Sequence, residues 1–220
     1  HDLKTPIAIL IGHLNGILDG VGDYKNAKPY IERSIAIAEQ MNQLVQSLLF
    51  IAYVENGTVM PVFEKSDFAE LVRRSVGEMS CLIEDKGQQL SVDIPDRAIC
   101  WFDGDMMERV IKNLLENAIK YSPVKGSIAI SMSQDRNANI KFEIENTGVT
   151  IPNASLPHLF EPFYRVDASR SKENGGNGLG MYIIKILLES HDASYGICNT
   201  DSGVKFQFCL TASKIHRKSI

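Results

Sequence analysis

Apolar residues in the first quarter of the chain recur at alternating spacings of four and three. They form two runs: Leu3, Ile7, Leu10, Leu14, Ile17 and Val21, then Ile37, Met41, Leu44, Leu48 and Ile51. This spacing places each run on one stripe of an α-helix. Because Gly20 and Gly22 separate the runs, residues 3–54 are predicted to form an antiparallel helical hairpin. A lone hairpin cannot bury both stripes, so a homodimer with a four-helix bundle is predicted.

The rest of the chain shows a mixed pattern. A break around 55–57 and Pro61 predict a linker at 56–64, which separates a hairpin domain at 1–55 from a second domain at 65–215. Helical periodicity is found at 66–85, 103–121 and 179–190. Strand patterns are found at 89–93, 98–102, 127–133, 140–145, 194–199 and 204–210. This order predicts an α+β sandwich in which helices cover a mixed sheet.

Composition and charge limit the kinds of partner and environment expected for this chain. The formal net charge is −4, whereas nucleic-acid binding favours basic surfaces, so no nucleic acid is expected. No apolar run approaches the roughly 18 residues that span a membrane. The four cysteines show no metal-binding spacing and are expected to be reduced thiols. Since the chain starts without methionine and inside a motif, it is interpreted as a fragment, and any membrane contact is assigned to segments outside it.

The segment HDLKTP opens the chain. His1 and Thr5 are four residues apart and share an exposed helix face. A neutral imidazole is a competent nucleophile toward phosphorus, and the adjacent Asp2 could orient the ring or accept its proton. Taken alone, an exposed helical histidine more often has no chemical role.

A second segment, NLLENAIKYS, places two amides one helical turn apart. Asn113 and Asn117 carry oxygens suited to Mg²⁺, a hard cation. Lys120 lies near the same face, followed by Tyr121, and an ammonium group suits phosphate oxygens. A merely solvated polar face explains any one of these residues, but explains the whole segment poorly.

Two glycine-containing segments and an aromatic one lie further along the chain. ENTGVTIP ends a predicted strand and contains Asn146 and Gly148. GGNGLGM leads directly into a helix, whose first N–H groups can bind phosphate; no GK[ST] follows, so it is not a Walker loop. FEPFYR lies between them, and either Arg165 or Arg170 is expected to meet a phosphate. A hydrophobic anchor is the alternative for that aromatic loop.

In the order in which they occur along the chain, these five segments resemble the H, N, first glycine, F and second glycine boxes of sensor histidine kinases. The resemblance implies a phosphoacceptor at His1, with Asp2 as its base or orienter and Thr5 in a phosphatase activity. It implies ATP and Mg²⁺ as cofactors, with Asn117 and Asn113 as metal ligands. A homodimer, a response-regulator partner and a cytoplasmic location beneath a membrane sensor also follow from it.

The resemblance further implies a Bergerat-type nucleotide site, of the kind shared with DNA gyrase B and MutL. Its expected residues are Asn113, Asn117, Lys120, Tyr121, Asn146, Gly148, Arg165, Arg170, Gly176, Gly178, Leu179 and Gly180. One position departs from the family, whose aspartate accepts a bond from the adenine amino group. Asn146 stands there, and its carbonyl can still accept that bond.

Two alternatives remain open. In the related ATPases a glutamate four residues before the metal-binding asparagine activates water. That position is Asn113 here, which cannot act as a base. Glu116 immediately precedes Asn117 and should therefore point elsewhere on the helix. A catalytically degenerate scaffold that binds partners is the other alternative, because Thr150 also replaces the second glycine of its box.

Overall fold

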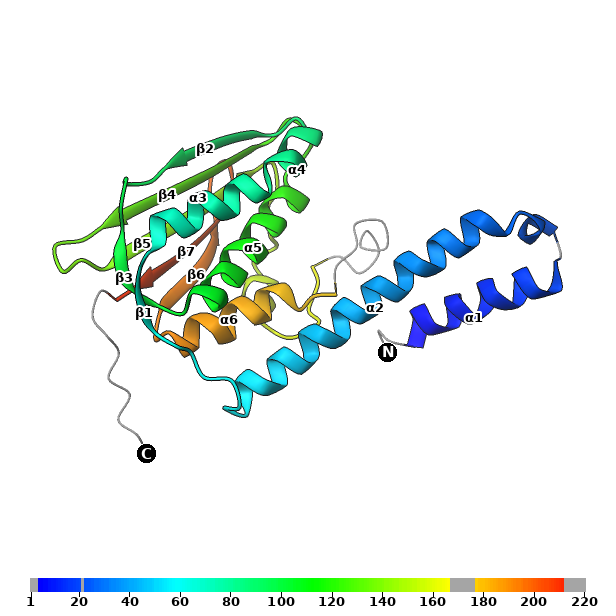
Figure 1. Cartoon of the computed structure of the whole chain (residues 1–220). Coiled ribbons are helices and arrows are strands. Elements are labelled where there is room, and N and C mark those ends of the chain that lie inside the picture. Colours follow the sequence, from blue (N-terminus) through cyan, green and yellow to red (C-terminus); the bar gives the residue numbers. More distant parts are fainter. Residues whose placement is uncertain (1–3, 21, 167–176, 212–220) are drawn as a thin grey trace. The chain divides into compact units, whose positions relative to one another are not determined.

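The computed structural model of the chain (Figure 1) describes residues 4–20, 22–166 and 177–211. Six residues named above lie outside these ranges: His1, Asp2, Leu3, Val21, Arg170 and Gly176. The chain divides between residues 58 and 59 into two compact units. The predicted fold class, a helical hairpin followed by an α+β sandwich, is confirmed.

The first unit is an antiparallel hairpin. Helix α1 (Lys4–Asp19) is followed by a short 3₁₀ helix, η1 (Gly22–Lys25), and by α2 (Ala27–Glu55). Aromatic packing fixes the turn: the Tyr24 ring lies so close to Gly16 that a Cβ added there would sit 2.7 Å from it. The His13 ring nitrogen Nδ1 lies 3.1 Å from the Ser34 hydroxyl, linking α1 to α2. A small residue at 16 therefore permits the close turn.

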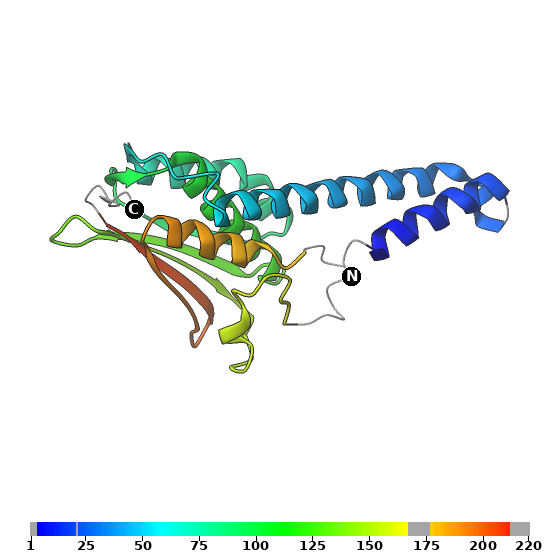
Figure 2. The ribbon, with the colours of Figure 1, turned by 90° about the horizontal axis from the view of Figure 1, so that it is seen from below.

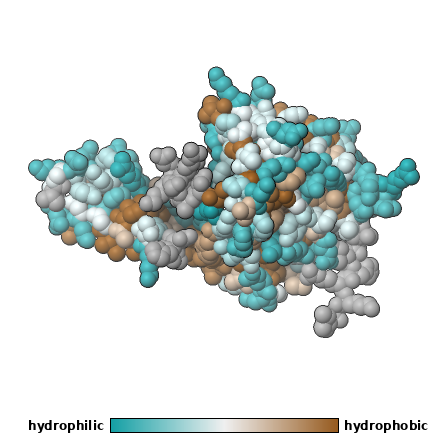
Figure 3. All heavy atoms as spheres, turned by 180° about the vertical axis from the view of Figure 1, so that it is seen from behind, coloured by the Kyte–Doolittle hydropathy of each residue, from teal (hydrophilic) through white to brown (hydrophobic). Residues whose placement is uncertain are grey.

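Large apolar side chains remain exposed along both helices of this unit. Figure 3 shows brown, apolar atoms gathered along one side of the hairpin. The exposed residues include Ile7, Ile9, Ile11, Leu14, Leu18, Ile31, Ile35, Val45 and Leu49. An apolar surface of this kind marks an interaction site in a soluble protein.

The second unit is built on a five-stranded sheet in the order β2-β4-β5-β7-β6. Its strands are β2 (Gln89–Asp93), β4 (Ser127–Gln134), β5 (Ile140–Thr147), β6 (Ser194–Asn199) and β7 (Gly203–Leu210). Only the β2–β4 pair is parallel among these described strands. The sheet is therefore mixed, as predicted.

Three helices cover one face of this sheet, as Figure 2 shows. They are α3 (Phe68–Glu78), α5 (Gly104–Tyr121) and α6 (Gly180–Ser190). The core between the layers is aromatic, since the Phe68 ring packs edge-on against Phe142 and Phe208 with centroids 6.2 and 6.0 Å away. Burial alternates along β4, β5 and β7, because successive side chains point to opposite faces.

Side-chain caps set where two of these helices begin. The Asp103 carboxylate accepts a bond from the Met106 N–H, so α5 starts just after this residue as predicted. Asp67 accepts from the Ala69 N–H and caps α3. It also accepts from the Ala98 N–H at 2.9 Å, which ties the start of α3 to a distant part of the chain.

The prediction of one helix at 66–85 was wrong. The chain forms α3, then a break at Met79, then α4 (Ser80–Asp85). Gly77, a poor helix former, sits in the last turn of α3, and its carbonyl accepts a bond from the Ser80 hydroxyl. A further strand, β1 (Glu64–Asp67), pairs with β3 (Ile99–Phe102), although residue 64 was assigned to a linker.

Candidate nucleotide-binding site

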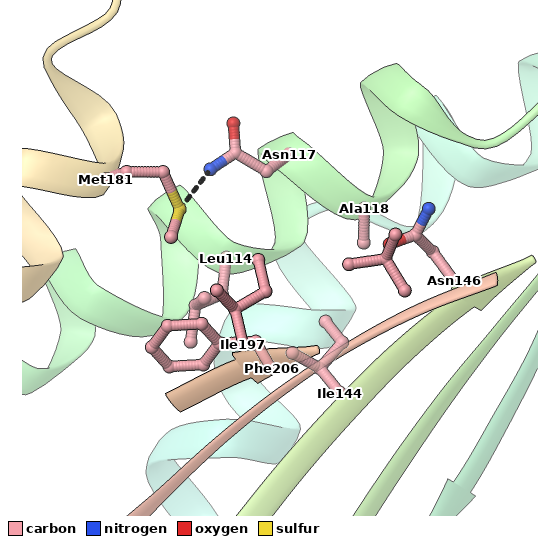
Figure 4. Close-up of a pocket in the computed structure, with 9 residues that line it drawn as sticks. Leu114, Asn117, Ala118, Ile144, Asn146, Met181, Ile197 and Phe206 are labelled. Atoms are coloured by element: carbon pink, nitrogen blue, oxygen red, sulfur yellow. Dashed lines mark hydrogen bonds between the residues drawn. The ribbon is translucent and has the colours of Figure 1, made fainter. Parts of the chain in front are cut away.

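A cavity of about 40 Å³ lies between the helical layer and the sheet (Figure 4). It is bounded by α5, by the start of α6 and by strands β5, β6 and β7. Its lining is Leu114, Asn117, Ala118, Ile144, Asn146, Met181, Ile197, Val204 and Phe206. Seven of these nine side chains are apolar, so the cavity suits an apolar part of a ligand that carries few polar groups.

Asn146 supplies the polar group on the sheet side of the cavity. It stands near the end of β5, in register with Ile128 on β4 and Val204 on β7. Its Nδ2 atom is buried and has no hydrogen-bond partner among the described residues. A buried donor without a partner costs roughly 1–3 kcal/mol, so this amide favours a ligand that accepts its hydrogen.

Two amides of α5 converge on the first residue of α6. A Cβ added at Gly180 would lie 3.0 Å from Asn113 Oδ1 and 3.9 Å from Asn117 Nδ2. Asn117 also lines the cavity, and its Nδ2 lies 3.5 Å from the Met181 sulfur (Figure 4). The Nδ2 of Asn113 bonds to the carbonyl of Arg109 in its own helix, which leaves its oxygen on the Gly180 side.

Positive charge gathers at the C-terminal end of α5. Burial lowers the pKa of Lys120, and the nearby charge of Arg165 lowers it further, while Glu116 acts in the opposite direction. The ammonium group also lies 5.0 Å from the centre of the Tyr121 ring. Two cations close enough to disfavour each other's charge would be stabilised by an anion between them.

The second glycine segment is anchored to the aromatic loop. The Phe163 N–H donates to the Gly178 carbonyl at 3.1 Å. Gly178 has a φ of +69°, and a Cβ there would lie 2.8 Å from the Phe163 carbonyl carbon. Leu179 is buried, and α6 begins directly after it without a side-chain cap. The segment therefore presents backbone at the start of α6, where N–H groups lack helical partners.

The first glycine segment requires glycine for a similar reason. Gly148 has a φ of +82°, and a Cβ would lie 2.7 Å from the Pro123 ring. Its N–H donates to the Ser202 carbonyl at 3.0 Å, which joins the end of β5 to the β6–β7 turn. Gly203 was not predicted, yet a Cβ there would overlap the carbonyl oxygen of Asn146.

Of the described residues that were predicted for the nucleotide, Asn117 and Asn146 line the cavity, and Asn113 and Gly180 lie beside Asn117. Asn113 abuts Gly180 but does not line the cavity, whereas Asn117 does both. Thr5 is exposed on α1, in the other unit. Glu116 is exposed and absent from the lining, in agreement with its predicted direction.

The sequence did not reveal that residues of strands β6 and β7 form one side of the cavity. Ile197 on β6 and Val204 and Phe206 on β7 close the cavity, although they follow Asn146 by about fifty residues or more. Their alternating pattern predicted strands, but no local signal identifies which strand lies beside β5. Met181 was noted only as the last letter of a glycine segment.

Comparison with known proteins identifies the class. Residues 102–214, just over half of the chain, match the family described as histidine kinase-, DNA gyrase B- and HSP90-like ATPases. The chain therefore belongs to this family. Residues 1–57 match the His Kinase A (phospho-acceptor) domain. The predicted resemblance to sensor histidine kinases is confirmed.

Individual relatives agree with this assignment. The chain is 31% identical over 206 residues to the sensor protein VanSB of Enterococcus faecalis, covering 94% of the chain and 46% of the relative. It thus spans less than half of that protein. The histidine kinase AdeS of Acinetobacter baumannii has a similar structure, with a TM-score of 0.80, 24% identity and coverage of 97% and 98% of the two chains.

The histidine kinase ThkA, solved in complex with the response regulator protein TrrA, gives a TM-score of 0.78 at 20% identity. The match covers 97% of this chain and 59% of ThkA. At these identities, the likeness to AdeS and ThkA establishes the fold. Within the described ranges, no helix is both long and apolar enough to cross a membrane.

Proposed function

We propose that the chain is an ATP-dependent protein histidine autokinase that passes its phosphoryl group to an aspartate of a response regulator. The observation that carries the proposal is the apolar cavity lined by Asn146 and Asn117, with Gly180 next to Asn117 and with Lys120 three residues after Asn117 on α5. This arrangement offers an apolar cavity near amide groups, backbone N–H groups and a cation. A nucleoside triphosphate with a metal ion requires each of these features.

Different residues would bind the base, the phosphates and the metal ion of the nucleotide. Asn146 would bind the base edge, and Lys120, Arg165 and the segment that begins α6 would hold phosphate oxygens. The Asn117 oxygen, with Asn113 as a second candidate, would hold Mg²⁺, which neutralises charge on the phosphates. Among the described residues there is no cluster of acidic, cysteine or histidine side chains that could hold a metal, so amide and phosphate oxygens are the ligands that the site offers. Gly148, Gly178 and Leu179 would keep the backbone close to the ligand, with Tyr121 beside Lys120.

The acceptor would be the His1 imidazole, which attacks the terminal phosphorus in line. Asp2 would orient the ring or take its proton, and electrostatic positioning would supply most of the rate. Thr5, exposed on α1, would position water when the chain removes phosphate from the regulator. The ThkA complex supports a response regulator as the partner, because ThkA shares the fold and binds one.

The hairpin unit would serve as the dimerisation domain. Its exposed apolar side chains, such as Leu14 and Leu18, are 57% and 84% accessible in the single chain. A second hairpin would bury them in a four-helix bundle. We place the chain at the cytoplasmic side of a cell-membrane sensor whose other segments lie outside this sequence.

One assay separates this function from the two alternatives. The chain is incubated with Mg²⁺ and ATP labelled at the γ-phosphate, and both protein-bound label and free phosphate are measured. A histidine kinase retains acid-labile label on the chain. An ATPase releases phosphate without labelling the chain, and a degenerate scaffold does neither; either outcome would refute the proposal.

A variant pair tests the assignment of the site. Asn117→Ala should weaken Mg·ATP binding by at least about tenfold, which corresponds to about 1.4 kcal/mol. Asn137→Ala, on the exposed β4–β5 turn, is the matched control and should leave affinity unchanged. Equal affinity of the two variants by calorimetry would remove Asn117 from the site.

A further inference from the structure

The cavity leaves recognition of a base edge to one side chain. Among the described residues that line it, only Asn117 and Asn146 are polar, and Figure 4 shows them at separate sides of the cavity. Asn117 faces Met181. The nearby Thr147 hydroxyl is occupied by the backbone of Ser127, with bonds of 2.9 and 3.3 Å. Asn146 is therefore the side chain available to the polar edge of a base.

An amide at this place has two complementary ways to bind a purine. Its oxygen accepts and its nitrogen donates. The edge of adenine offers an N6 amino donor beside the N1 acceptor. The edge of a 6-oxopurine, such as guanine or hypoxanthine, offers an O6 acceptor beside an N1–H donor. Rotation of the amide by half a turn matches either edge, whereas a carboxylate can only accept and would repel O6.

Among the described residues, no hydrogen bond of the Asn146 Nδ2 atom opposes that rotation. This atom is buried without a partner among those residues, so rotation breaks no hydrogen bond that it makes with them. The residues in register with it, Ile128 and Val204, carry side chains without hydrogen-bonding groups. No neighbour in the ladder therefore holds the amide in one orientation.

We propose that Asn146 makes this site accept 6-oxopurine nucleoside triphosphates as well as ATP. The inference rests on the proposed nucleotide-binding function and specifies its substrate class. A good bidentate base contact discriminates by about 1–3 kcal/mol against the wrong edge. An amide that satisfies both edges loses this discrimination, so the dissociation constants of the two classes should lie within about tenfold of each other.

The test is calorimetric titration of the 220-residue chain, in Mg²⁺, with ATP and inosine triphosphate. Inosine triphosphate presents the 6-oxopurine edge without the 2-amino group of guanine, so steric exclusion of that group does not obscure the result. Asn146→Asp is the decisive variant, and it should weaken the binding of inosine triphosphate relative to that of ATP by at least about tenfold. Asn137→Asp makes the same chemical change on an exposed turn and should leave the ratio unchanged.

The outcomes are distinct. Comparable binding of both nucleotides by the natural chain, with preference for ATP in Asn146→Asp, supports the inference. Tight ATP binding with inosine triphosphate weaker by more than about tenfold overturns the inference alone. An unchanged ratio in Asn146→Asp also overturns it, because Asn146 then does not read the base. Failure of both nucleotides to bind would refute the proposed function together with the inference.

Discussion

Gly178→Ala tests the contact that shapes the second glycine segment. Its φ of +69° lies in the left-handed region, which costs a residue with a side chain about 1–2 kcal/mol. The added methyl group would also lie 2.8 to 3.0 Å from three backbone atoms of Phe163, and such overpacking costs about 1–3 kcal/mol. Together, these two costs should destabilise the packing of the second glycine segment against Phe163 by about 2–5 kcal/mol.

The strain can be relieved in two ways, and both are measurable. Either the second unit unfolds at lower urea concentration, or the segment leaves Phe163 and Mg·ATP affinity falls. Gly77→Ala is the matched control, since no described atom beyond the adjoining residues of its own helix lies within 4 Å of its added Cβ, and its φ is not in the left-handed region. That control should be neutral or stabilising by about 0.5–1 kcal/mol. If Gly178→Ala matched this control in both urea stability and ATP affinity, the close contact between Gly178 and Phe163 would not constrain the segment.

Three further perturbations follow from the structure. Gln88→Leu removes bonds from Nε2 to the carbonyls of Ile119 and Ser122 at the end of α5, so urea unfolding should show a loss of about 1–3 kcal/mol. Leu18→Glu places charge on the exposed apolar stripe, and sedimentation equilibrium should show a weaker dimer; unchanged association would exclude this stripe from the interface. Burial of Asp67 opposes its ionisation, but backbone N–H groups hold its pKa below the ordinary 3.8. Its contribution to stability is therefore present above that value and lost as pH falls through the lower folded pKa. Asp67→Asn should flatten the acid limb of the stability profile, and an unaltered limb would count against this bonding.

Local chemistry explains what the sequence predicted well. Strand β2 occupies the predicted residues 89–93, and α5 begins after Asp103 because a carboxylate caps it. The four-residue spacing of Asn113 and Asn117 was enough to predict that both face one side, since a helix repeats every 3.6 residues. Both amides indeed abut Gly180.

Long-range contacts explain what the sequence could not supply. Strand β1 exists because Glu64–Asp67 pairs with Ile99–Phe102, and nothing near residue 64 signals that pairing. The cavity wall formed by Val204 depends on the order of strands in the sheet, which is likewise non-local. The orphaned nitrogen of Asn146 required knowledge of every neighbouring atom, so only the structure could reveal it.

In the proposed reaction, the terminal phosphate of ATP moves to the imidazole of His1. The most direct measurement incubates the chain with Mg²⁺ and γ-labelled ATP, isolates the labelled peptide at alkaline pH and locates the phosphoryl group by mass spectrometry. We expect acid-labile label on His1, its loss in His1→Gln with ATP affinity retained, and its persistence in the control His13→Gln. Label that persists in His1→Gln, or that maps to another residue, would show that His1 is not the phosphoacceptor.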